Sequence, residues 1–277
     1  MGDVLDVEQW PQLRDPVMLV ALSGWVDGGM AGGGALAAVA EQLEAARAFG
    51  TIDLSELVDL QQTRPTVSLI DGTTRSVSWP SVDLIAGRAG RDVVLVAGPE
   101  PSIRWREFTE QLVHAAQQLH IQMAFTLGGM PAPVSHRRPV SVLATASSRS
   151  VAQEVGALRT DYVGPTGVQT VLQVALGEVG IPAVGLWAQV PHYVAGTPSP
   201  PAIRALLERL RDLAGIEVDL HLLDEQSDLY TEKVEEGLAE RPDVAEMVLQ
   251  LEAHDDDDLP TGEDLAREIE RFLRDER

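Results

Sequence analysis

A glycine-rich segment, residues 23–34, is the first part of the chain whose residue types suggest chemistry. It reads Ser-Gly-Trp-Val-Asp-Gly-Gly-Met-Ala-Gly-Gly-Gly and follows a short apolar run. Such turns can close backbone N–H groups on an anion at a helix N-terminus. The segment lacks a P-loop lysine, because Gly34 stands at that position, and it lacks the dinucleotide pattern Gly-x-Gly-x-x-Gly. Asp27 lies in the turn with no cation nearby, which further disfavours a nucleotide site. The pattern therefore favours a turn that lets a helix pack closely on a sheet.

Two more glycine turns, Gly128–Gly129 and Gly164–Gly167, follow or adjoin expected strands. Because the carboxyl ends of parallel strands line the usual ligand crevice of an open α/β sheet, the three turns are candidates to share one edge. A pocket near Met130 is one interpretation, and turns that only let layers pack are the other. The candidate ligand or partner surface comprises Gly24, Trp25, Asp27, Gly28, Gly128, Gly129, His136, Arg137, Gly164, Thr166 and Gly167.

Catalytic and metal-binding patterns are weak. No Gly-x-Ser-x-Gly elbow surrounds Ser23, and the six histidines show no metal-ligand spacing. Arg137 and Arg138 beside His136 form either an anion clamp or an exposed turn. Trp25 is either an interface anchor or a lid on the glycine turn. We predict no catalytic residue and no metal site.

The residue inventory excludes several function classes. The chain has no cysteine, so thiol nucleophiles, disulfides and cysteine metal sites are absent. Its only lysine is Lys233, which removes a P-loop or a Schiff-base lysine from the main body. We predict no cofactor.

The net charge of −22 is concentrated near the C-terminus. From Glu217 onward there are 22 acidic and 6 basic residues, a net of −16, which leaves −6 for the first 216 residues. Nucleic-acid binding needs a basic surface, so we expect no nucleic-acid partner. The acidic residues fit a solvated helical face better than a surface for a basic partner.

The first sixteen residues carry Asp3, Asp6, Glu8 and Asp15 against Arg14, unlike a secretory signal. The apolar stretch 17–40 contains Asp27 and six glycines, which disfavour a membrane helix. We expect a soluble, cytoplasmic protein with no membrane partner.

The elements that would position these residues alternate between strand and helix patterns. Strands are expected at 17–22, 92–97, 123–127, 140–146, 181–190 and 218–223, with a hairpin formed by 66–70 and 75–79. Helical spacing spans 36–46, 105–119, 148–155, 168–179 and 203–213, and three short helices follow residue 230. The alternation predicts a three-layer α/β/α sandwich with a mixed, mostly parallel sheet. We expect a core domain at 1–222 and an acidic helical subdomain at 223–277.

The order of several short motifs resembles the proteasome assembly chaperone 2 family. They are Gly24-Trp25-Val26-Asp27-Gly28-Gly29, Gly98-Pro99-Glu100-Pro101 followed by Trp105, Leu127-Gly128-Gly129-Met130-Pro131, Gly164-Pro165-Thr166-Gly167, and His192-Tyr193 before a proline-rich helix start. Residues 259–273 are similar to the actinobacterial branch. The resemblance implies a phosphorylase-like core with a helical appendage, oligomerisation and, in some relatives, chaperoning of proteasome assembly. Those relatives dock by a C-terminal hydrophobic–tyrosine–any tail, whereas this chain ends Asp275-Glu276-Arg277.

Two functions follow as hypotheses. The first is a non-catalytic, chaperone-like protein-binding module that forms a homo-oligomer and has a protein partner, with proteasome-related proteins among the candidates. The second is a small-molecule hydrolase or phosphorylase-like enzyme with Asp27 as base and His136, Arg137 or Arg138 holding an anion. Similar bacterial proteins have been labelled ATP-grasp carboligases, but Lys233 alone cannot supply the lysines of such a site.

Overall fold

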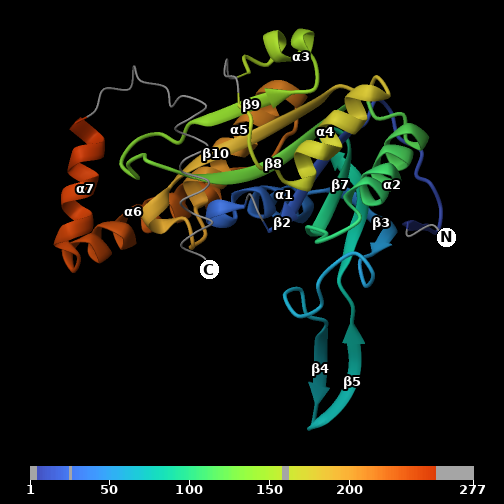
Figure 1. Ribbon diagram of the computed structural model, residues 1–277, viewed down its shortest axis with the longest axis horizontal. Helices are drawn as coiled ribbons and strands as arrows, with labels where there is room; N and C mark the ends of the chain where they lie inside the picture. The colour runs from blue at the N-terminus through green and yellow to red at the C-terminus, as the bar shows by residue number, and fades with distance from the viewer. Residues whose placement is uncertain (1–4, 25–26, 158–161, 254–277) are drawn as a thin grey trace.

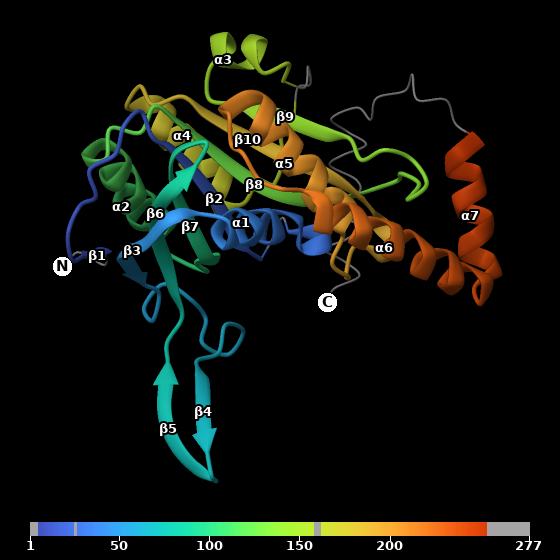
Figure 2. The same cartoon turned by 180° about the vertical axis from the view of Figure 1, so that it is seen from behind.

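A computed structural model describes residues 5–24, 27–157 and 162–253 of the chain (Figure 1). Its centre is an eight-stranded sheet with the order β1-β3-β6-β7-β2-β8-β10-β9, and helices lie on both faces (Figure 2). The expected three-layer α/β/α sandwich is confirmed.

The strands are β1 (Leu5–Val7), β2 (Val17–Ser23), β3 (Glu44–Asp53), β4 (Thr66–Ile70), β5 (Thr73–Ser78), β6 (Ser81–Ala89), β7 (Arg91–Pro99), β8 (Met123–Ala132), β9 (Val142–Ala146) and β10 (Ala183–Pro191). The α-helices are α1 (Ala31–Glu41), α2 (Trp105–Gln118), α3 (Arg149–Glu154), α4 (Val168–Glu178), α5 (Pro200–Ala214), α6 (His221–Ala239) and α7 (Pro242–Ala253). Two 3-10 turns, Gly28–Met30 and His192–Val194, precede α1 and follow β10.

The sheet is mixed, as expected. Its four central strands β7, β2, β8 and β10 run parallel. The pairings on either side are antiparallel and bring in β6, β3, β1 and β9. The parallel part is therefore confined to the centre, where the carboxyl ends of four strands meet at one edge.

Alternating side chains of β2 build two separate cores. Val17, Leu19 and Ala21 face α1 and α5, whereas Met18 and Val20 face α2 and α4. A strand buried on both faces must be apolar at every position, which explains the uninterrupted run that marks β2 in the sequence.

The predicted hairpin is confirmed in β4 and β5, which pair only with each other as a separate two-stranded sheet. It projects from the body on the side of β3 and β6 (Figure 1). The antiparallel strands of the main sheet are instead contributed by other segments.

Three expectations for individual elements were wrong. The first helix does not continue to residue 46: α1 ends at Glu41, and β3 begins at Glu44. Gly128 and Gly129 form no turn, because β8 runs through them and pairs with β10 as far as Ala132. Residues 218–223 form no strand, since α6 begins at His221.

Two of the three helices expected after residue 230 correspond to α6 and α7, which are joined by a short link at Glu240 and Arg241. The third, over 261–272, lies outside the described residues. Among the described helices, none combines the length and apolar character needed to cross a membrane.

Candidate functional site

Asp27 closes the N-terminus of α1. Its Oδ1 accepts hydrogen bonds from the backbone N–H groups of Gly32, at 2.8 Å, and Gly33, at 3.4 Å. The carboxylate thereby occupies the position in which a helix N-terminus would hold an external anion. Burial raises the pKa of Asp27 above its usual range, and the two backbone hydrogen bonds offset part of that rise.

The glycines after Asp27 let backbones approach one another directly. Asp27 forms a bridge with Gly129 in β8, and a Cβ on Gly129 would overlap the carbonyl oxygen of Gly28. A Cβ on Gly32 would likewise overlap the carbonyl oxygen of Leu127. Helix α1 therefore rests on the backbone of β8, which agrees with the packing interpretation of this segment.

A second carboxylate, that of Glu100, closes α4. Its Oε1 accepts from the N–H of Val168 at 2.7 Å, and its backbone N–H donates to the carbonyl of Ser23 at 2.8 Å. A Cβ on Gly24 would lie 3.1 Å from the Glu100 side chain. Glu100 thus connects the ends of β2 and β7 to Val168, the first residue of α4, which Gly167 directly precedes.

His136 and Arg137 bind the chain's own C-terminal helices. Arg137 donates to both carboxylate oxygens of Glu235 on α6, at 2.6 and 2.9 Å, and to Glu252 on α7 at 3.0 Å. The His136 side chain is fully buried and lies 2.7 Å from the Tyr193 hydroxyl and 3.2 Å from Glu235. We call these five residues the helix clasp.

Two pKa shifts follow from the helix clasp. The Arg137 guanidinium lowers the pKa of Glu235 to about 2. Burial lowers the pKa of His136 below its usual range, although Glu235 opposes that shift. Arg138 contributes one further bond, from its guanidinium to the carbonyl of Glu252 at 2.8 Å.

A buried polar network fixes α4 on the sheet. Gln173 donates to the Thr126 hydroxyl at 2.6 Å and accepts from Thr145 at 3.2 Å. The indole of Trp187 donates to the same Thr145 hydroxyl at 3.2 Å. A Cβ on Gly185 would lie 2.5 Å from the Gln173 amide nitrogen, so a larger residue there would displace side chains of this network.

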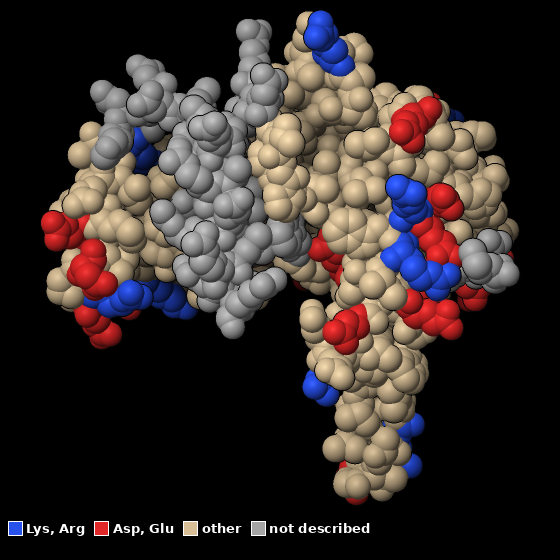
Figure 3. Space-filling model, in the orientation of Figure 1, with Lys and Arg blue, Asp and Glu red and all other residues tan. Residues whose placement is uncertain are grey.

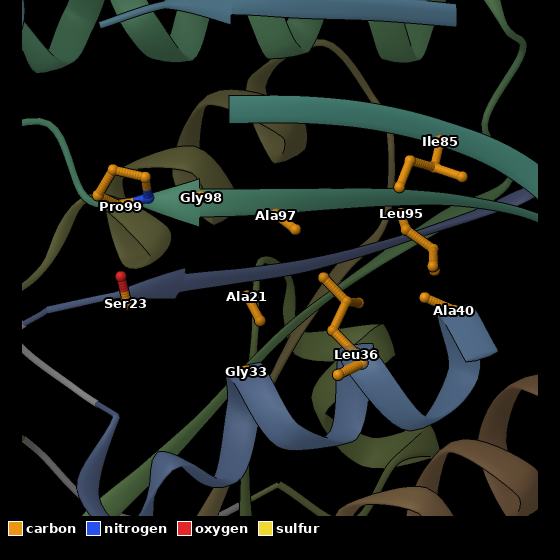
Figure 4. A pocket seen from close by; sticks show the side chains of 11 residues that line it. Ala21, Ser23, Gly33, Leu36, Ala40, Ile85, Leu95, Ala97, Gly98 and Pro99 are labelled. Carbon is orange, nitrogen blue, oxygen red and sulfur yellow. The ribbon is translucent and has the colours of Figure 1, made fainter. Parts of the chain in front are cut away.

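An apolar groove of about 330 Å³ lies between α1 and the β2–β7–β6 part of the sheet (Figure 4). Leu36 and Ala40 of α1 face Leu95 and Ile85 across it. Among the described residues, no ionisable side chain lines this groove, and Ser23 is the one polar side chain that does. The described lining therefore offers contact area for an apolar group, and it supplies neither an acid nor a base to activate the Ser23 hydroxyl.

The sequence candidates separate into two groups. Asp27, Gly28 and Gly129 come together, Gly24 contacts Glu100, and Gly167 directly precedes Val168, which Glu100 binds. Gly128 stands beside Gly129 within β8. The other candidates are placed apart: His136 and Arg137 lie in the helix clasp, Gly164 and Thr166 are exposed before α4, and Trp25 lies outside the described residues.

Sequence reasoning missed Glu100, Glu235 and Glu252 as functional partners. Glu100 had a usable signal, because it directly follows the end of a buried strand at the edge where helices begin. Glu235 and Glu252 had none, because they are two carboxylates among many in an acidic segment. Within the described residues, no group of acidic, histidine or cysteine side chains is arranged to hold a metal ion.

These observations define a class of protein: an α/β/α sandwich with a mixed sheet whose central strand ends are closed by the chain's own carboxylates. The chain belongs to the PAC2 family, whose model matches residues 21–238.

Solved structures of actinobacterial proteins agree with this family. A proteasome-assembly chaperone homologue from Mycobacterium tuberculosis is 39% identical, with a TM-score of 0.77, and the match covers 84% of this chain and 99% of that chain. A PAC2 family protein from Streptomyces avermitilis is 39% identical, with a TM-score of 0.78, and the match covers 84% of this chain and 100% of that chain. An M. tuberculosis protein of unknown function is 26% identical, with a TM-score of 0.86 and 96% of both chains covered. A search of curated proteins finds no match.

Proposed function

We propose that this protein is a non-catalytic, chaperone-like binding module that acts on protein partners in the cytoplasm as a homo-oligomer. Proteasome subunits are the partners to test first, because a relative that is 39% identical is described as a proteasome-assembly chaperone homologue. We further propose that residues 223–277 form a helical subdomain beside the core domain of residues 1–222.

One observation carries the proposal: the groups that would bind an anion are already engaged within the chain. Asp27 occupies the N-terminus of α1, and Glu100 occupies that of α4. Arg137 is held by Glu235 and Glu252. Recruiting a phosphate or carboxylate substrate here would first require breaking these contacts, which favours recognition through surface over catalysis.

The alternative, a hydrolase or phosphorylase-like enzyme, has one observation in its favour. The raised pKa of Asp27 is a property of general bases. However, Oδ1 of Asp27 is bound to the backbone, and His136 contacts Tyr193 and Glu235. Thr166 is exposed before α4. None of the hydrogen bonds described for Asp27 and His136 joins these three residues, so they form no catalytic arrangement in the described part of the chain.

The partner is tested by incubating the purified full chain with purified proteasome α and β subunits from the same host. Native mass spectrometry then measures complexes at micromolar concentration. We expect a complex that survives 0.5 M NaCl, because salt screens non-specific attraction to an acidic protein. Absence of any complex with either subunit, separately or mixed, contradicts the proteasome assignment.

A further inference from the structure

The β4–β5 hairpin exposes side chains that no described part of the chain covers. All eleven of its strand residues are exposed. It extends away from the main sheet as a separate arm in both ribbon views, and its surface is mostly uncharged in Figure 3. The arm is attached through residues 54–65 after β3 and directly before β6.

The two faces of this arm differ in chemistry. Val67 pairs with Val77, and Leu69 lies two positions beyond Val67 on the same side. Trp79, two positions after Val77 in extended chain, continues that side. These four side chains are 52–62% exposed. The opposite face carries the polar pairs Thr66–Ser78 and Ser68–Ser76. Beyond a register shift between Ser68 and Leu69, its one large apolar side chain is Ile70, which pairs with Thr73 near the tip of the arm.

Such alternation is typical of strands with one buried face. A two-stranded hairpin without further strands or a covering layer is at best marginally stable in water. The apolar face of the arm therefore requires a cover from outside the described body.

We propose that the apolar face of this hairpin arm docks onto a second copy of the chain, in the groove between α1 and β2, β7 and β6. The groove is apolar and uncharged, as is the face formed by Val67, Leu69 and Val77. Its volume of about 330 Å³ suits two aliphatic side chains. Each copy carries both an arm and a groove, so a reciprocal pair or a closed ring satisfies every copy.

The charges of the hairpin arm and of the groove margin also favour a second copy of the chain as the occupant of the groove. Residues 64–79 contain Arg64, Arg75 and Asp71, a net of +1 within a chain of net charge −22. Near the groove, Glu41 directly follows the groove residue Ala40, and Asp83 precedes the groove residue Ile85 by two positions on β6. Both carboxylates are exposed, so a slightly basic arm meets an acidic margin on another copy.

The first experiment compares two charge-matched variants by sedimentation velocity of the purified full chain. Val67→Glu with Val77→Glu places two carboxylates on the apolar face, whereas Ser68→Glu with Ser76→Glu places the same pair on the polar face. We expect the valine variant to weaken self-association about 100-fold or more, because two apolar side chains lose their burial. The serine variant should associate within about threefold of the parent protein, since its substitutions lie outside the contact.

A second experiment uses the absence of cysteine from the parent sequence. Leu69→Cys on the arm and Ala37→Cys in the groove are made in separate proteins, mixed and oxidised. We expect a disulfide-linked heterodimer from this mixture, and none when Ser68→Cys replaces Leu69→Cys, because disulfides form only between cysteines that approach closely.

Three results would overturn the proposal: a monomeric parent protein at 50 micromolar, equal loss of association in both glutamate variants, or no Leu69→Cys cross-link to Ala37→Cys. Circular dichroism of each variant verifies folding, and the arm lies outside both cores of the main sheet. Because only the purified chain is used, failure here is distinct from failure to bind proteasome subunits.

Discussion

At the scale of single residues, Gly32 shows how one missing Cβ positions a helix. It lies inside α1 against the carbonyl oxygen of Leu127, whereas Gly237 lies inside α6 with nothing within 4 Å of an added Cβ. Helical propensity alone favours alanine at both positions by up to about 1 kcal/mol. Their surroundings therefore predict opposite signs for the same substitution.

We expect Gly32→Ala to lower the free energy of unfolding by about 3 kcal/mol, because α1 must move away from β8. Gly237→Ala should raise it by about 0.5 kcal/mol. Urea denaturation followed by circular dichroism measures both. A stabilising Gly32→Ala would mean that α1 does not rest on the β8 backbone.

Asp27 gives a second prediction, which separates its hydrogen bonds from its charge. Asp27→Ala loses the acceptor for Gly32 and should cost about 1 kcal/mol. Asp27→Asn keeps an acceptor oxygen and should cost less than Asp27→Ala at pH 7.

The contribution of Asp27 to folding stability should change with pH in a defined direction. Because the pKa of Asp27 is raised in the folded state, its contribution to stability falls as pH rises from the unfolded value of 3.8 through the folded pKa. Asp27→Asn should remove that dependence, and urea titrations at several pH values test it. An asparagine variant as unstable as the alanine variant at pH 7 would show that the ionised carboxylate itself is required.

At the scale of elements, the helix clasp attaches α6 and α7 to the β8–β9 connection. Arg137 joins Glu235 on one helix to Glu252 on the other. Removing the guanidinium releases two helices at once, although partial exposure limits its contribution to about 1 kcal/mol or less. We expect Arg137→Met to increase hydrogen–deuterium exchange in α6 and α7 while leaving β2 and β8 protected. Unchanged exchange in these helices would contradict the role given to the clasp.

Low pH should destabilise the same two helices, α6 and α7. The pKa of Glu235 is about 2 when folded against 4.5 when unfolded, so its stabilising contribution is present above pH 4.5 and is lost as pH falls towards 2. The lowered pKa of His136 adds a loss that begins as pH falls below its unfolded value of 6.5. We expect α6 and α7 to exchange faster at pH 4 than at pH 7 after correction for intrinsic rates. Glu235→Gln should reduce this difference, and an identical difference in that variant would refute the assignment.

Much of the element order was predictable because burial leaves a strong pattern. The apolar face of α2 and the fully apolar run of β2 follow directly from packing. The start of β3 was missed because Ala45 and Ala46 continue the helical spacing of α1, although the helix ends at Glu41 and Ala45 has a positive φ of 51°.

The candidate site was less predictable because its glycines were interpreted from their type alone. Gly128 and Gly129 indicate a turn by composition, yet they allow a strand to pass beneath a helix. Whether two adjacent glycines form a turn or a strand beneath a helix is decided by tertiary contacts. A single sequence does not show which segments make those contacts. The clasp residues Arg137 and Glu235 are 98 positions apart, so no local pattern links them.

At the scale of the whole molecule, the net charge of −22 predicts a salt response. Self-repulsion in an acidic chain is screened by added salt, whereas the few described ion pairs lose little because most are exposed. We expect 0.5 M NaCl to raise the melting temperature by about 3 °C relative to 20 mM NaCl at pH 8. The gain should disappear near the isoelectric point of 4.5. A lower melting temperature in salt at pH 8 would mean that attractive pairs dominate.

The carboxylates of Asp27 and Glu100 also have a consequence for how the polypeptide folds. Because the amide groups at the starts of α1 and α4 are satisfied from within, the strand ends need no small ion to neutralise them during folding. Denatured chain returned to phosphate-free buffer should therefore refold as fast, and to the same yield, as chain supplied with phosphate or ATP.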